Sequence, residues 1–89
     1  MGAAKGTLYI PRTIDLPGPF RVKVTQLKPM QMKTKHGEFY DGIWDVEAMT
    51  VDLNRKLPHK RKWYVFSHEL AHVVNDWILW LTNTEIAAG

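Results

Sequence analysis

The sequence predicts an α+β domain in which three or four mostly antiparallel strands come first and one long helix follows. Two patterns favour this class. Apolar and polar residues alternate in short segments up to about residue 54, as in half-buried strands, and the period then changes to that of a helix. The chain has 89 residues, which suits one compact domain. We therefore expect a single domain over residues 1–89, with a frayed start over residues 1–6.

The first two predicted strands lie on either side of a proline-rich turn. Residues 7–16 form the first strand, with residues 7–10 as its regular part and Pro11 as an interruption. Residues 17–19, Pro-Gly-Pro, form the turn. Residues 20–27 alternate apolar and polar side chains, so this second strand should bury one face. The residues on that inward face are Phe20, Val22 and Val24.

The next segments predict a polar loop and two further strands. Residues 29–38 are rich in polar and basic side chains and should form the loop. Residues 39–46 form the third strand, which contains Gly42, and residues 49–53 form the fourth. Alternate residues of the fourth strand should share one face, because successive side chains of a strand point to opposite faces. The residues on that face are Met49, Val51 and Leu53.

The last predicted element is a helix over residues 58–81. Pro58 suits the first turn of a helix, since the N–H group that proline lacks has no partner there in any case. At about 100° per residue, six large apolar side chains fall on one stripe, which should pack on the sheet. These residues are Trp63, Phe66, Leu70, Val73, Trp77 and Leu81.

The composition excludes several classes of protein and site. The chain contains no cysteine, so it forms no disulfide and offers no thiolate to a metal. Any metal must therefore be held by imidazole and carboxylate groups. No apolar run approaches the roughly 18 residues that span a membrane, and the N-terminal residues have no apolar signal core. These features lead us to expect a cytoplasmic protein with no membrane partner.

A basic cluster precedes the predicted helix. The net charge is +3, and five of the positive side chains lie between residues 55 and 62. Such a cluster can contact nucleic acid or an acidic partner. The interpretation that we favour is a solvated entrance to the helix. A nucleic-acid partner is the least favoured hypothesis, because it rests on this cluster alone.

The helix carries the motif His-Glu-x-x-His, in which His68 and His72 are separated by about one turn. Residues four apart lie on the same helix face, so both imidazoles can approach one zinc ion at about 2.0–2.1 Å. Glu69 lies roughly 100° round the helix from His68, where its carboxylate can reach a water on the metal. The pattern predicts His68 and His72 as zinc ligands and Glu69 as the catalytic general base. We expect this side of the helix to lie opposite the apolar stripe and to face a cleft.

Three segments, residues 41–45, 49–54 and 64–72, resemble the ImmA/IrrE-type zinc metallopeptidases, and especially the short forms encoded in phages and prophages. The resemblance covers about residues 39–80, nearly half of the chain. It implies a minimal zincin, with a twisted sheet, an edge strand lining a cleft and an active-site helix below that strand. It also implies that the strand at residues 49–53 pairs with an extended peptide or protein substrate.

The third zinc ligand is less clearly marked in this chain. Larger members of the family supply a third protein ligand, commonly a glutamate on a later helix, but only 17 residues follow His72 here. Asp76 lies on the metal side of the helix, about 6 Å further along the axis than His72. It is predicted either as the third ligand or as a hydrogen-bonding partner that orients His72. Glu85 could bind the metal only if the chain doubles back after Leu81, and water or another chain are the further alternatives.

The predicted function is that of a zinc-dependent metalloendopeptidase, which hydrolyses peptide bonds with a metal-activated water. Zinc lowers the pKa of bound water to about 7, and Glu69 would pass the water proton to the leaving amine. The alternative is a non-catalytic, zincin-derived metal-binding module that contacts a phage or host regulator. Glu69 favours the enzyme, because a purely structural site needs no base. The small size favours the module, because it leaves no room for a specificity domain. The pattern predicts no particular oligomeric state.

Overall fold

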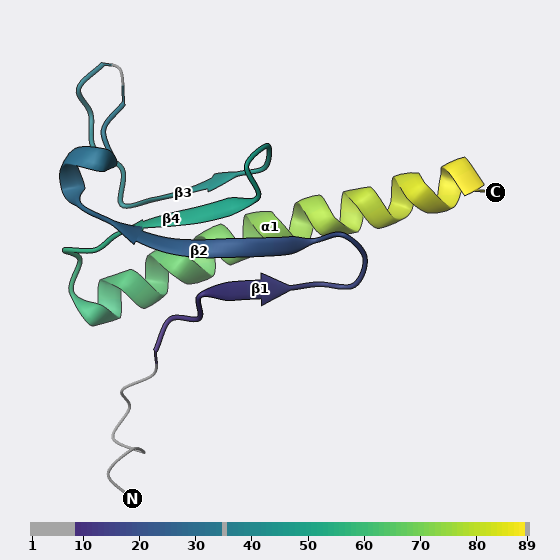
Figure 1. Ribbon diagram of the computed structural model, residues 1–89, viewed down its shortest axis with the longest axis horizontal. Coiled ribbons are helices and arrows are strands. Elements are labelled where there is room, and N and C mark those ends of the chain that lie inside the picture. Colours follow the sequence, from purple (N-terminus) through teal and green to yellow (C-terminus); the bar gives the residue numbers. More distant parts are fainter. Residues whose placement is uncertain (1–8, 35, 89) are drawn as a thin grey trace, which may run out of the picture.

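The computed structural model describes residues 9–34 and 36–88, with side chains described as far as residue 83. Within these residues, a four-stranded sheet lies against one long helix, so the predicted α+β class is confirmed (Figure 1). The elements in chain order are β1 (Thr13–Asp15), β2 (Arg21–Leu27), β3 (Gly42–Asp45), β4 (Thr50–Asn54) and α1 (His59–Ala88).

The sheet is mixed, and its strand order is β1-β2-β4-β3 (Figure 1). β1 pairs antiparallel with β2, and β3 pairs antiparallel with β4, as expected for most of the sheet. The central pairing of β2 with β4 is parallel, with Val24 opposite Val51. β3 runs in the direction opposite to β2, and the β3–β4 hairpin reverses the chain again. β4 therefore runs in the same direction as β2, beside which it lies. The edge strands are therefore β1 and β3, and β4 is internal.

The predicted first strand is present only in its second half, beyond Pro11. Thr7 and Leu8 lie outside the described residues, and neither Tyr9 nor Ile10 is in a strand. β1 begins only at Thr13, beyond Pro11, since proline has no N–H group to donate to a sheet. Ile10 nevertheless contributes to the core, where it is only 9% exposed.

The loop between β2 and β3 has more structure than predicted. A 3-10 helix covers Pro29–Gln31, and Lys33 forms a bridge with Phe39. Thr34 N–H also donates to the Glu38 carbonyl, so the segment pairs with itself. Because Phe39 is engaged in this small hairpin, β3 begins at Gly42 rather than at residue 39.

The core forms between the inner face of the sheet and α1. Phe20, Val22 and Val24 are all buried, which confirms the predicted inward face of β2. Val51 and Leu53 of β4 are completely buried beside them. This core is small, as expected of a short chain.

The helix begins at His59, directly after Pro58 as predicted, but it continues to Ala88 rather than ending near Leu81. No glycine or proline occurs between Pro58 and Gly89 to terminate it. Although α1 has 30 residues, no helix in the described part of the chain is both long and apolar enough to cross a membrane.

The packed face of α1 is rotated from the predicted stripe. Among the described side chains of α1, the buried residues are Val65, Phe66, Glu69 and Val73. Trp63 and Leu70 are only partly buried and pack at the margin of the core. The prediction that Glu69 lies opposite the packed face is therefore wrong. Its side chain belongs to the side of the helix that meets the sheet.

Candidate metal centre and cleft

The helix brings His68 and His72 together through their Nε2 atoms, which are 3.3 Å apart. Their rings meet edge to face, with 4.9 Å between centroids. Both side chains are exposed, so the pair is open to solvent. The predicted proximity of the two imidazoles on consecutive turns is thus present in the structure.

The separation of the two nitrogens fits a metal ion. Two ligands at about 2.0–2.1 Å from a tetrahedral zinc are about 3.3–3.4 Å apart. The observed distance of 3.3 Å between the two Nε2 atoms matches this separation. Neutral imidazoles at this distance can also share a hydrogen bond, whose direction depends on the tautomer. His68 and His72 are therefore suited to hold zinc through Nε2.

Glu69 lies in the floor of an adjoining cleft and is only 9% exposed. Among the described residues its carboxylate has no hydrogen-bond or ion-pair partner. No fully buried side-chain nitrogen or oxygen atom in this part of the chain lacks a partner. The carboxylate oxygens of Glu69 must therefore open on the cleft, where water or a ligand can satisfy them. This is the situation that a general base requires.

The cleft has a volume of about 440 Å³ and lies between α1 and the segment that leads into β3. Its lining residues are Phe39, Tyr40, Asp41, Gly42, Arg61, Tyr64, Val65, His68 and Glu69. Phe39 and Tyr64 are 57% and 62% exposed, so aromatic surface flanks the opening. Arg61 donates to Asp41 at 3.0 Å and its guanidinium lies 5.1 Å from the centre of the Tyr64 ring. The cleft thus has an aromatic rim and an ion pair beside the candidate base.

Gly42 determines how closely β3 approaches the helix. A Cβ atom at this position would lie 2.5 Å from Val65 Cγ1 and 3.4 Å from Glu69 Cγ. Only glycine allows the strand to pass this near to the helix surface. A glycine inside a strand is the available sequence signal for such an approach. The strand pattern predicts a strand through Gly42, but it does not predict this contact.

The predicted role of Asp76 has no support from the geometry. Its Oδ2 accepts a hydrogen bond of 2.7 Å from the Trp44 indole nitrogen. Among the described residues, no group of three histidine, aspartate or glutamate side chains is placed to bind a metal. Asp76 is thus held toward β3, and it is not gathered with His68 and His72. The ligand role of Asp76 stays a prediction.

The side chain of Glu85 lies outside the described residues. The helix runs through this position, so the backbone does not double back after Leu81 as ligation by Glu85 would require. The candidates for the remaining positions around a metal on His68 and His72 are then Asp76, water, substrate or another chain.

The strand predicted to pair with substrate is not available. β4 has β2 on one side and β3 on the other, so both of its edges are occupied. β3 is the edge strand that adjoins the cleft, because Gly42 lines the cleft and begins β3. The edge open to an extended peptide is therefore that of β3.

A scan against models of protein families, a search of curated proteins and a search of solved structures find no match. The interpretation of the site therefore rests on its own geometry.

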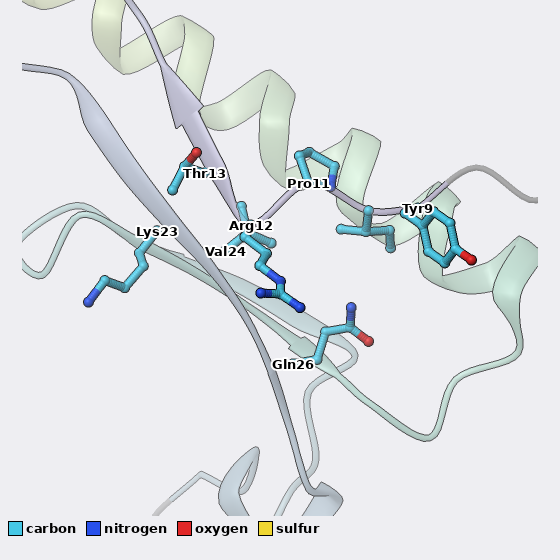
Figure 2. Close-up of a pocket in the computed structure, with 8 residues that line it drawn as sticks. Tyr9, Pro11, Arg12, Thr13, Lys23, Val24 and Gln26 are labelled. Carbon is cyan, nitrogen blue, oxygen red and sulfur yellow. The ribbon is translucent and has the colours of Figure 1, made fainter.

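A larger cavity lies elsewhere, beside the start of β1, and has a volume of about 790 Å³. Figure 2 shows Arg12 and Gln26 extending toward one another there, whereas Lys23 extends away from them. None of the predicted site residues lines this cavity. It is therefore not the candidate metal centre.

Removal of the Asp76 carboxylate is expected to destabilise the fold more than it weakens metal binding. Asp76→Ala leaves the half-buried Trp44 N–H without its acceptor, so the free energy of unfolding should fall by about 1–3 kcal/mol. Because Asp76 is bonded to Trp44 and is not grouped with His68 and His72, zinc affinity should fall by less than about 10-fold. Loss of a residue that orients a ligand would instead lower the affinity by about 10–100-fold. Chemical denaturation and zinc titration measure the two effects.

Trp44→Phe provides the matched variant, because it removes the donor and keeps an aromatic ring. Combined with Asp76→Ala, it should show a coupling of about 0.5–3 kcal/mol. Additive effects on stability, together with a 10–100-fold loss of zinc affinity in Asp76→Ala, would instead place Asp76 at the metal.

Proposed function

We propose that this protein is a zinc metallopeptidase that hydrolyses peptide bonds in the cleft between α1 and β3. One observation carries the proposal. His68 and His72 present two Nε2 atoms 3.3 Å apart, while Glu69, the residue between them on the same helix, turns an unpartnered carboxylate to the adjoining cleft. A pair of metal ligands next to a free base is the combination that metal-assisted hydrolysis needs.

The roles of the chain's own residues follow from their positions. His68 and His72 would hold the metal through Nε2, and a bound zinc supplies an acidic water and a Lewis acid for the substrate carbonyl. Glu69 would accept a proton from water in the cleft and deliver it to the departing amine. Its low exposure limits competition from bulk solvent. The edge of β3 would align an extended peptide through main-chain hydrogen bonds.

The second candidate is a non-catalytic, zincin-derived metal-binding module that contacts a phage or host regulator. It is favoured by the ligand count, since the described residues offer no third protein ligand beside the two histidines. It is opposed by Glu69, because a carboxylate kept unpartnered in a cleft has no structural purpose there. We therefore keep the peptidase as the principal proposal.

The test uses the whole chain loaded with zinc and a library of unstructured peptides. Cleavage that is lost with a chelator and restored by added zinc is the result expected of a peptidase. Product termini identified by mass spectrometry show which bonds are cut. Stoichiometric zinc with no cleavage of any peptide would contradict the peptidase and favour the binding module.

A further inference from the structure

The cavity beside the start of β1 contains two side chains with N–H groups that face one another. Arg12 directly precedes β1, and Gln26 lies near the end of β2. Both line the cavity, and Figure 2 shows them extending toward one another. The Arg12 side chain has no hydrogen-bond or ion-pair partner among the described residues. The space between the two side chains is therefore open to a ligand.

The orientation of the Gln26 amide is determined by Lys62. Lys62 lies near the start of α1, and its Nζ donates to Gln26 Oε1 at 2.9 Å. A lysine ammonium group can only donate hydrogen bonds, so the carbonyl end of the amide has to face Lys62. The NH2 end then lies on the side of Arg12, as the blue nitrogen atom in Figure 2 shows. Arg12 and Gln26 thus present donors to the same space, with no acceptor between them.

The charge around this space is positive. Arg12 and Lys62 each carry one positive charge, and neither forms an ion pair among the described residues. None of the described residues that line the cavity is acidic. Lys62 also keeps spare N–H groups, since an ammonium group has three donors. Cationic side chains with unused donors are the groups that bind oxyanions most strongly in proteins.

The number of positive charges favours a phosphate monoester among the common oxyanions. A phosphate monoester carries a charge of about −1.5 to −2 at pH 7 and three strong acceptor oxygens. It therefore matches two cations and one amide donor. A carboxylate has a single charge and two oxygens, and each phosphate diester of a nucleic acid backbone also carries a single charge. Either of these would leave one of the two cations without a counter-charge.

The other lining residues indicate what the phosphate is attached to. Tyr9, Ile10 and Pro11 line the same cavity directly before Arg12 in the chain. Tyr9 is 85% exposed, so its ring is accessible to an organic group. Sites for small molecules typically combine apolar and aromatic lining with a few polar groups that fix the orientation of the ligand. This cavity has both parts next to one another.

We infer that the cavity beside β1 binds the phosphate group of an organic phosphate monoester. Arg12 and Lys62 neutralise the phosphate, the Gln26 NH2 group donates a further hydrogen bond, and Tyr9 contacts the organic part. The cavity shares no lining residue with the cleft that contains Glu69. The inference is therefore independent of whether the protein is a peptidase or a binding module.

Phenyl phosphate, titrated into the whole chain and followed by NMR, provides the first test. It should shift the side-chain amide signals of Gln26 saturably, with one ligand bound per chain. Arg12→Gln should raise the dissociation constant by at least about 10-fold, because it removes a charge-assisted donor. Arg21→Gln is the matched control, since it makes the same change at the opposite end of β2. It should bind phenyl phosphate like the parent chain.

Gln26→Glu tests the role of the amide. A carboxylate at this position still accepts from Lys62, but it places a negative charge beside Arg12, so binding of phenyl phosphate should be lost. Gln31→Glu makes the same substitution in the 3-10 helix between β2 and β3 and should bind like the parent chain. All four substituted side chains are exposed, so circular dichroism should show every variant to be folded.

Four results would overturn the proposal. The first is the absence of a saturable shift at millimolar phenyl phosphate. The second is a shift at His68 and His72 in place of Gln26, which would assign the ligand to the candidate metal centre. The third is an equal loss of affinity in Arg12→Gln and Arg21→Gln, which would reflect net charge alone. The fourth is tighter binding of acetate, of inorganic phosphate or of an oligonucleotide without a terminal phosphate, which would assign the site to a carboxylate, to the free ion or to nucleic acid.

Discussion

Glu69→Gln is expected to lower peptide cleavage by about 10²–10⁴-fold, which is the contribution that a general base typically makes. The substitution keeps the size and shape of a side chain that packs next to Gly42, but it removes the basic carboxylate. Zinc content should be unchanged, because the metal-binding atoms belong to His68 and His72. Cleavage rates on a peptide identified from the library, measured for both proteins at equal zinc occupancy, give the ratio.

Glu47→Gln is the control for this experiment, since Glu47 is an exposed residue between β3 and β4 and lies outside the cleft. It should cleave like the parent chain. Cleavage by Glu69→Gln at the parent rate would exclude Glu69 as the base, even if the activity depends on zinc. A variant that loses zinc together with activity would instead point to a direct role of Glu69 in metal binding.

The double variant His68→Ala/His72→Ala is expected to lose zinc binding entirely. The two imidazoles supply the protein ligands that the described residues bring together, and alanine offers no replacement donor. The fold should be retained, because both side chains are exposed and take no part in the core. Elemental analysis after dialysis measures zinc content, and circular dichroism verifies the helix.

His36→Ala/His59→Ala is the matched control, because it also removes two exposed histidines from the chain. Its zinc content should equal that of the parent chain. Stoichiometric zinc in the His68→Ala/His72→Ala variant would place the metal elsewhere. Loss of zinc in the control alone would instead assign the zinc site to His36 in the β2–β3 loop and His59 at the start of α1.

The sequence predicts local features of the fold well, for identifiable reasons. β2 is half-buried, so its alternation over residues 20–27 marks both the strand and its inward residues. The start of α1 after Pro58 is likewise a local signal. The parallel pairing of β2 with β4 is not local, because it depends on where the β3–β4 hairpin docks. The internal position of β4, and with it the correct substrate edge, could not be predicted from periodicity.

The rotation of α1 about its own axis could not be predicted, for a different reason. Residues 63–81 are apolar on more than one side, so the helical period supports several stripes equally well. The close approach of Gly42 to Val65 and Glu69 favours the observed orientation. The partner of Asp76 is also non-local, since the Trp44 indole comes from β3. The pairing of His68 with His72 is predictable, because a single turn of helix sets it.

The position of the cleft within the chain has a consequence for how the site assembles during folding. All the residues that line the cleft, and both histidines, belong to the continuous stretch of residues 39–72. The contacts in this stretch form within the β3–β4 hairpin and between this hairpin and the helix that follows it. They join residues that are close in sequence, so each contact closes only a short loop. Contacts of this kind form earlier than those between distant segments. We therefore expect β1 and β2 to pair with a unit in which the site residues are already close together, and changes at the N-terminal edge of the sheet should affect global stability more than the architecture of the site.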